Sequence, residues 1–189
     1  MIVVKQFIVL LKKFMTRDKS GRGMVSVICI YNNEKVLNEV LLKSLDGQTV
    51  KPELLLIDNR NNKKYKSAAE ALNNEAENAH GDILVFIHQD MWIHDRDWIE
   101  NVEKYVNTIS DLGIAGVHGM DAEGETWEER VKYSIKISNT DDFNSVPATI
   151  VPEKVQTLDE CVLIVLRRVF DIQKFDAQTF DGWDCYGSD

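Results

Sequence analysis

The 189-residue sequence contains little proline, glycine or cysteine: three prolines, ten glycines and three cysteines. So little proline and glycine argues against a disordered or low-complexity chain. The cysteines (Cys29, Cys161 and Cys185) are odd in number, and no pair has the spacing of metal ligands. Cys29 and Cys161 lie inside apolar runs and are predicted to be buried, which favours a reducing, cytoplasmic compartment.

Apolar residues near the N-terminus, from Ile2 to Phe14, form a stretch broken by Lys5 and Gln6. The stretch is shorter than the roughly 20 residues of a membrane span, and no small-residue cleavage site follows it, so a signal peptide is not expected. Its larger apolar residues fall on one helical face, with lysines elsewhere. Two interpretations stay open: a basic amphipathic helix that contacts an anionic membrane surface through residues 1–15, at the inner face of the membrane, or a helix packed on the domain or a partner.

Charge divides the chain at a flexible linker, residues 19–23. Residues 1–23 carry six Lys/Arg and one acid, a net +5, so the remainder of a chain with net charge −9 carries −14. An acidic body is a poor general binder of nucleic acid, so no nucleic-acid partner is expected. We therefore predict an amphipathic basic segment and linker over residues 1–23 and one domain over residues 24–189.

Short apolar runs alternate with amphipathic stretches between residues 24 and 118. The runs predict strands, the first of them buried, and cover residues 25–30, 54–57, 83–87 and 114–117. The stretches between them predict helices: leucines at positions 37, 41 and 45, an alanine-rich segment over residues 65–80, and a segment that carries Trp98 and is capped by Asp95 or Asp97. This alternation predicts an α/β fold with a parallel sheet covered by helices on both faces.

Polar side chains directly follow the first three predicted strands. In sheets of this kind ligands bind beyond the carboxyl ends of the strands, so these side chains should converge on one crevice if the strands are neighbours. They are Tyr31 and Glu34 after the first strand, Asp58 and Asn59 after the second, and His88, Gln89 and Asp90 after the third.

Each of these groups suits one part of a nucleotide ligand. Asp58 can accept a base N–H or a ribose hydroxyl, Asn59 can donate and accept at a base edge, and Tyr31 can stack on a nucleobase. His88 and Asp90, two residues apart, can reach a divalent cation together. The alternatives are an Asn- and Asp-stabilised turn, a partly buried tyrosine and ordinary loop polarity.

The pattern of apolar residues differs in the second half of the chain. Apolar and polar residues alternate over residues 131–137, which predicts a strand with one solvent-facing side, and a second, apolar strand is predicted over residues 161–166. The chain ends in a segment rich in aromatics, glycine and acids, which we expect to form the lip of a site. Trp183 and Tyr186 can stack on a sugar, and Asp184 and Asp189 flank that loop, where a carboxylate can act as general base. The alternatives are core aromatics and a solvated end.

Taken together, four segments resemble family 2 of the GT-A glycosyltransferases, and most closely its branch of glycosyltransferase-like proteins related to a streptomycin-biosynthesis protein. They are residues 25–32, 53–59, 73–90 and 175–189, and the likeness covers about residues 24–189. The resemblance implies a GT-A-like, Rossmann-type, three-layer α/β/α sandwich with a mostly parallel central sheet.

The resemblance also implies roles for individual residues. Tyr31, Glu34, Asp58, Asn59 and Gln89 would bind the nucleotide, and Asp90 and His88 would bind a divalent metal (Mn²⁺ or Mg²⁺). Trp183, Asp184 and Tyr186 would bind the acceptor, and Asp189 would be the general base.

The sequence also departs from the family pattern. His88 stands in place of the first acid of the Asp-x-Asp metal motif. Asn59 replaces the second residue of the acidic pair that follows the second strand, and Ser188 replaces the glutamate that precedes the base. Members of the family normally continue beyond Asp189 into a helix over the site, so the sequence is also compatible with a C-terminally truncated domain.

The predicted function is metal-assisted, inverting transfer of a sugar from a nucleotide-diphosphate donor to a carbohydrate or other hydroxyl acceptor. The alternative is a non-catalytic module of the same fold that binds a nucleotide sugar or a protein. A nucleotidyltransferase ranks last, because no glycine- and lysine-rich phosphate loop is present. Neither the sugar nor the acceptor follows from the fold.

Overall fold

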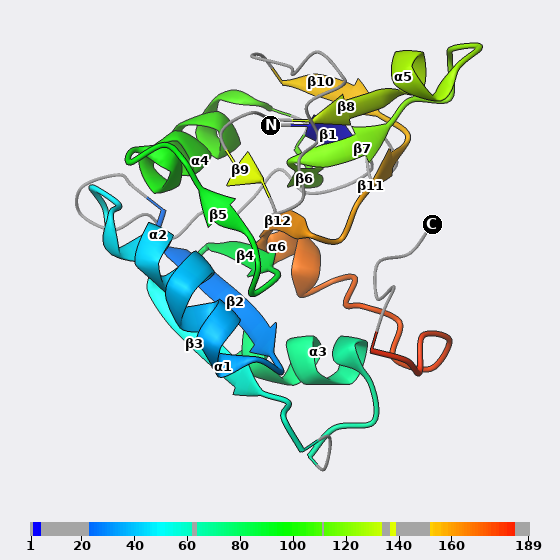
Figure 1. The fold of residues 1–189 in the computed structure, drawn as a ribbon. Helices are drawn as coiled ribbons and strands as arrows, with labels where there is room; N and C mark the ends of the chain where they lie inside the picture. The colour runs from blue at the N-terminus through cyan, green and yellow to red at the C-terminus, as the bar shows by residue number, and fades with distance from the viewer. Residues whose placement is uncertain are drawn as a thin grey trace.

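A computed structural model of the chain describes residues 2–4, 23–61, 64–110, 112–133, 137–138 and 152–183. A seven-stranded sheet of order β10-β1-β6-β12-β4-β2-β3 forms its centre (Figure 1). Its strands are β1 (Ile2–Val4), β2 (Val25–Tyr31), β3 (Glu53–Asp58), β4 (Ile83–Ile87), β6 (Ile114–Gly116), β10 (Glu153–Val155) and β12 (Val162–Leu166). A three-stranded sheet joins β11 (Thr157–Leu158), β7 (His118–Met120) and β8 (Val131–Tyr133), and β5 (Trp92–Ile93) pairs with β9 (Ile137–Ser138).

The strand directions confirm the α/β prediction and add one strand that it did not place. β2 runs parallel to both β3 and β4, as the alternating pattern predicts. β12 lies between β4 and β6 and is antiparallel to both, so β6 has the same direction as β4 without touching it. The carboxyl ends of β2, β3 and β4 therefore meet at one edge, but the fourth predicted strand is separated from them by β12.

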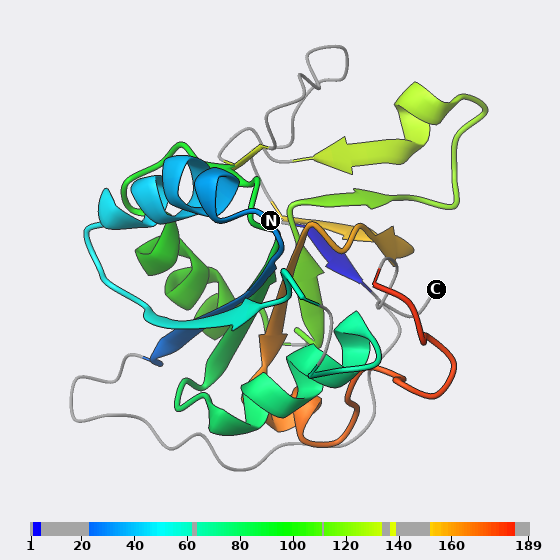
Figure 2. The same ribbon diagram turned by 60° about the horizontal axis from the view of Figure 1, so that its bottom comes forward.

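Helices cover both faces of the sheet and complete the three layers of the predicted sandwich (Figure 2). On one face lie α1 (Glu34–Leu37), the π-helical segment η1 (Asn38–Leu42), α2 (Lys43–Asp46) and α4 (Trp98–Thr108); on the other lie α3 (Ala68–Asn78) and α6 (Arg167–Phe170). The short helix α5 (Trp127–Arg130) precedes β8.

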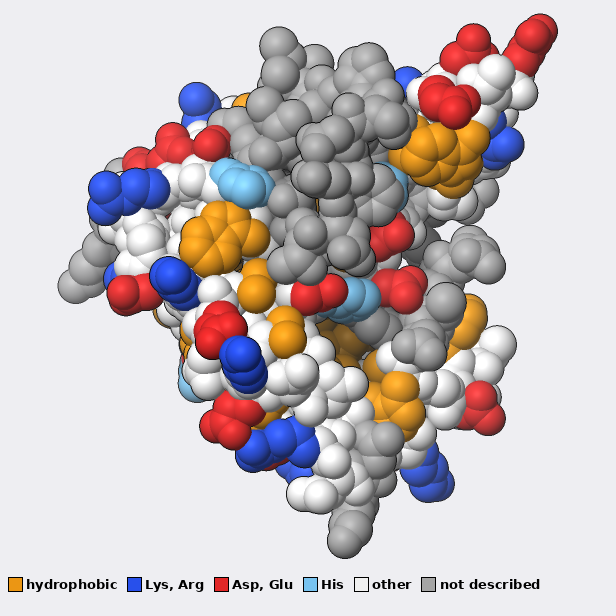
Figure 3. All heavy atoms as spheres, viewed as in Figure 1, with side chains coloured by type: hydrophobic (Ala, Val, Ile, Leu, Met, Phe, Trp, Pro, Cys, Tyr) orange, Lys and Arg blue, Asp and Glu red, His pale blue; other side chains and the backbone are white. Residues whose placement is uncertain are grey.

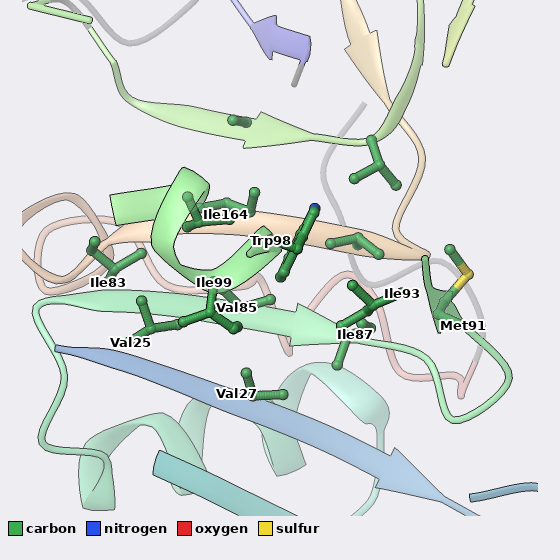
Figure 4. Close-up of a cluster of buried hydrophobic side chains, with 14 of the residues drawn as sticks. Val25, Val27, Ile83, Val85, Ile87, Met91, Ile93, Trp98, Ile99 and Ile164 are labelled. Carbon is green, nitrogen blue, oxygen red and sulfur yellow. The ribbon is translucent and has the colours of Figure 1, made fainter. Parts of the chain in front are cut away.

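Alternating side chains of the central strands supply two separate hydrophobic cores. Val25 and Val27 of β2 and Val85 of β4 face α4, where Trp98 and Ile99 are buried (Figure 4). The intervening residues, such as Ile28 and Phe86, face α3 on the other side. Strands whose two faces are both buried have few polar positions, and this explains the nearly continuous apolar runs in the sequence.

One predicted helix start and one predicted helix cap need correction. The alanine-rich helix begins at Ala68 rather than Tyr65, because Ser67 is its N-cap and accepts a hydrogen bond from the Glu70 N–H (3.1 Å). Asp97 holds the N-cap position of α4 but its side chain makes no capping bond. The acceptor is instead the Gln48 Oε1 atom, which takes a hydrogen bond from the Ile99 N–H (3.1 Å).

The N-terminal residues also differ from the helix predicted for them. Ile2–Val4 form β1, which pairs with β6 and β10 inside the central sheet. Three consecutive β-branched residues favour a strand over a helix, and this local preference outweighs the helical periodicity that begins at Val3. The rest of the predicted membrane-contacting helix, residues 5–15, lies outside the described residues. Within the described residues, no helix has both the length and the apolar character needed to cross a membrane.

Candidate active site

The carboxyl ends of β2, β3 and β4 carry the predicted nucleotide and metal residues, and hydrogen bonds tie the three ends together. The Asn59 N–H donates to the Tyr31 carbonyl oxygen (2.8 Å), which continues the β2–β3 ladder by one residue. The convergence predicted from the strand order is therefore present for these two loops. In Figure 3, histidine and acidic side chains gather near the middle of the face shown.

Arg60 lies at the centre of a cluster of predicted nucleotide-binding residues, although Arg60 itself was not predicted to be part of the site. Its Nε atom donates to Asp58 Oδ1 (2.9 Å) and its Nη2 atom to Asp58 Oδ2 (2.5 Å), a bidentate pair. Its Nη1 atom donates to Glu34 Oε2 (2.5 Å), and its guanidinium carbon lies over the Tyr31 ring, 5.6 Å from the centroid. Three of the five predicted nucleotide-binding residues thus contact one guanidinium.

The charges of this cluster are mutually stabilised. The hydrogen bonds from the Arg60 side chain and main chain hold the pKa of Asp58 well below its usual range, and the same pair raises the pKa of Arg60. Burial first, and then the Asp58 charge, raise the pKa of Tyr31. Asp58 is therefore ionised at neutral pH, and Tyr31 carries its hydroxyl proton. A sequence clue to Arg60 did exist: an arginine two residues after a strand-end aspartate, in the same loop.

Gln89 joins the end of β4 to the end of β2. Its Oε1 atom accepts hydrogen bonds from the Asn32 N–H (3.2 Å) and the Asn33 N–H (3.0 Å), and its Nε2 atom donates to Asn32 Oδ1 (2.6 Å). The Asn33 side chain in turn caps α1 by accepting from the Val36 N–H (3.2 Å). Gln89, predicted as a nucleotide contact, thus holds the loop after β2 against the loop after β4.

His88 and Asp90 flank Gln89, and both side chains are half-buried. The His88 N–H donates to the Cys161 carbonyl oxygen (3.0 Å), so the metal motif rests on the start of β12. Burial foremost, with a contribution from the Asp90 charge, raises the pKa of the Cys29 thiol in β2. Cys29 is fully buried, as predicted, whereas Cys161 is half-buried.

The metal prediction concerns a shared site rather than a complete protein cage. Among the described residues, no group of three or more His, Cys, Asp and Glu side chains could hold a metal ion. Cations that bind substrate phosphates commonly take only one or two protein carboxylates and complete their coordination with phosphate oxygens and water. The predicted pair, one carboxylate (Asp90) and one imidazole (His88), has the chemistry for a cation of this kind, and its metal role remains a prediction.

A second histidine–carboxylate pair lies beside this motif and was not predicted. His118 Nδ1 lies 3.7 Å from Asp159 Oδ2, and Asp159 Oδ1 accepts a hydrogen bond from the Cys161 N–H (2.9 Å). The sequence contains no spacing that would pair these residues, because His118 and Asp159 come together only when β7 and β11 pair.

The acceptor residues are only partly described. Trp183 is half-buried and packs against the hydrophobic core beneath α3, and the Gly182 carbonyl oxygen accepts a hydrogen bond from the Ala68 N–H (2.9 Å) at the start of that helix. Asp184, Tyr186 and Asp189 lie outside the described residues. The predicted acceptor and base roles therefore remain predictions.

Comparison with known proteins gives one family match. The model of a glycosyltransferase-like family matches residues 26–189. No curated protein matches the sequence significantly. Among solved structures, the chain is similar to a mannosyltransferase from Pyrobaculum calidifontis in complex with GDP-Man and Mn²⁺, with a TM-score of 0.49 and 17% identity. That alignment covers 88% of this chain and 52% of the other, so the chain spans about half the length of this relative.

Proposed function

This chain belongs to the glycosyltransferase-like family, and we propose that it transfers a sugar from a nucleotide-diphosphate donor to an acceptor hydroxyl. The observation that carries the proposal is the union of three strand-end loops at one edge of the sheet. Hydrogen bonds of Arg60 join the loops after β2 and β3, and hydrogen bonds of Gln89 join the loops after β2 and β4, which supports one shared site. A nucleotide bound across these loops has its base near Asp58 and its diphosphate near Asp90.

The donor side of the reaction uses the loop after β4. Asp90, with His88, would hold a divalent cation, which neutralises charge on the diphosphate leaving group when bound. Gln89 keeps this loop attached to the loop after β2, so the base and the diphosphate are positioned as one unit. Such positioning matters because a small misplacement of reacting groups lowers the rate strongly.

The acceptor side rests on the resemblance of residues 175–189 to the family. Asp189 takes the proton of the acceptor hydroxyl as that oxygen attacks the anomeric carbon. The bond from the anomeric carbon to the diphosphate oxygen breaks, and the nucleoside diphosphate leaves from the opposite face, with inversion. Trp183 and Tyr186 stack against the acceptor sugar beside Asp184.

A non-catalytic module of the same fold is the second candidate. The observation that favours it is that Asp58 and Glu34, two predicted nucleotide-binding residues, already form ion pairs with Arg60. Such a module would bind a nucleotide sugar without transferring or hydrolysing it. Turnover separates the two candidates.

The test combines calorimetric binding of nucleoside diphosphates, with and without Mn²⁺, and a sugar-transfer assay with the full chain. Replacing Asp90 by asparagine should weaken metal-dependent binding by about tenfold or more, since one charged contact is lost. Asp171→Asn, at an exposed position at the end of α6, is the matched control and should bind as the wild type does. Binding that Mn²⁺ does not affect would contradict the metal role, and binding without turnover would favour the non-catalytic module.

A further inference from the structure

The guanidinium of Arg60 presents the same hydrogen-bonding pattern as one edge of a nucleobase. Two adjacent N–H groups meet the two oxygens of Asp58, at 2.9 Å and 2.5 Å, in a side-on bidentate pair. The guanidinium carbon lies over the Tyr31 ring, 5.6 Å from its centroid. An aromatic face and a carboxylate edge at this spacing form a binding place for a flat group with two parallel donors.

Only one common nucleobase offers two adjacent donors on its pairing edge. Guanine has N1–H next to the N2 amino group. Uracil and thymine have a single N–H between two carbonyl oxygens, so they can donate one hydrogen bond to one carboxylate oxygen but cannot donate to both. Adenine and cytosine have an amino group next to a ring nitrogen that is an acceptor, and an ionised carboxylate has no proton to donate to it.

We propose, on the basis of the glycosyltransferase function proposed above, that the donor carries guanine and that Asp58 is the residue that selects it. Guanine takes the place of the Arg60 guanidinium: its ring stacks on Tyr31, and its N1–H and N2–H donate to the two Asp58 oxygens. Arg60 is an internal stand-in that keeps the carboxylate oriented and paired until the donor arrives.

Displacing Arg60 from Asp58 by guanine should cost little free energy. The side chains of Arg60 and Asp58 are 43% and 41% exposed, and that of Glu34 is 59% exposed. Ion pairs this exposed contribute little net free energy, since water and salt compensate for their loss. After displacement, Arg60 can retain Glu34 as a partner while Asp58 turns to the base. Removing the competing guanidinium by Arg60→Gln should therefore raise the affinity for GDP by about two- to fivefold.

The first measurement is calorimetric binding of GDP, IDP, UDP and ADP to the wild-type chain with Mn²⁺. IDP differs from GDP only by the missing N2 amino group, so the ratio of their affinities isolates one hydrogen bond to Asp58. GDP should bind most tightly, and about tenfold more tightly than IDP, because a hydrogen bond to an ionised acceptor is lost. This comparison needs no variant and does not depend on a variant folding.

The second measurement uses Asp58→Asn. An amide presents one donor and one acceptor, and xanthine presents one donor (N1–H) and one acceptor (O2) where guanine presents two donors. The variant should lose its preference for GDP and bind XDP more tightly than GDP, a gain that structural damage cannot produce. Asp171→Asn, which is far from Tyr31 in sequence and exposed, should keep the wild-type order.

The outcomes separate this inference from the proposed function. Tighter binding of UDP or ADP than of GDP would overturn guanine selection while leaving a nucleotide-sugar transferase in place. Equal binding of GDP and IDP, or no gain of XDP binding in Asp58→Asn, would overturn the role of Asp58. A loss of GDP affinity in Arg60→Gln would overturn the displacement of Arg60. Failure to bind any of the four nucleotides would contradict both proposals.

Discussion

Replacing Glu53 by glutamine should destabilise the end of the sheet opposite the candidate active site. The Glu53 Oε2 atom accepts hydrogen bonds from the Ser26 hydroxyl (2.5 Å) and the His80 N–H (2.8 Å), and its Oε1 atom lies 2.6 Å from His80 Nδ1. Ser26 is fully buried, and its oxygen also accepts from the Gly81 N–H (2.8 Å). One carboxylate therefore joins β2, β3 and the connection from α3 to β4. A glutamine amide has a single oxygen and can accept hydrogen bonds at only one of the two carboxylate positions.

The magnitude follows from the ionisation of this carboxylate. Partial burial opposes its charge, but the hydrogen bonds from Ser26 and His80 outweigh that effect and lower the pKa of Glu53 to about 2, against 4.5 for an ordinary glutamate. At 1.36 kcal/mol per pKa unit, this difference corresponds to about 3 kcal/mol. The folded-state pKa is depressed, so this stability is fully present above pH 4.5 and is lost as the pH falls from about 4.5 through 2.

Urea unfolding followed by tryptophan fluorescence at pH 7, 5 and 3.5 measures both effects. At pH 7 we expect Glu53→Gln to lower the free energy of unfolding by about 2–3 kcal/mol. The fall in stability between pH 5 and 3.5 should be shallower in the variant than in the wild type. Glu39→Gln, at an exposed position on η1, is the matched control and should follow the wild-type curve. A cost below about 0.5 kcal/mol at pH 7, or an unchanged acid slope, would refute the reasoning.

Two further substitutions test contacts that hold the chain in register. Arg167→Met removes hydrogen bonds to three main-chain carbonyls at and just after the end of α3, so the free energy of unfolding should fall by about 2–3 kcal/mol. In the same urea assay, the free energy of unfolding of Arg167→Lys should lie between those of the wild type and Arg167→Met. An Arg167→Met variant as stable as the wild type would contradict this role. Gln89→Ala should weaken calorimetric nucleotide binding by about tenfold and change unfolding by less than about 1 kcal/mol, because it releases the loop after β2 without opening the core; unchanged binding would refute the coupling of the two loops.

Two strands of the candidate site, β2 and β4, were predictable because both of their faces are buried, and β3 was predictable from an apolar run although Leu54 and Leu56 are exposed. β2 and β4 are continuous apolar runs, and a parallel order brings their carboxyl ends together whatever the details of packing. The place of β12 was not predictable, since an apolar run of five residues carries no information about its neighbours or direction. β1 was missed because three residues are too few to show a period of two against the longer helical pattern around them.

The candidate site was predicted as a set of positions but not as a network. Asp58 and Tyr31 were found because they follow strands directly. Arg60 was not found, although it follows Asp58 by two residues, because its contacts with Glu34 and with the Tyr31 ring depend on the pairing of β2 with β3. Gln89 shows the same limit: its position was predicted, but its use in binding another loop depends on how close β2 and β4 lie.

The position of β12 has a consequence for how the protein is made. Ile164 pairs with Val85 on one side and Ala115 on the other, so a late segment of the chain fills the middle of a sheet whose other central strands are synthesised much earlier. Until it arrives, β4 and β6 each present an unpaired edge of the kind that invites association with other chains. A growing chain that has reached only residue 150 lacks β12, so its central sheet is incomplete until residues 162–166 have been translated.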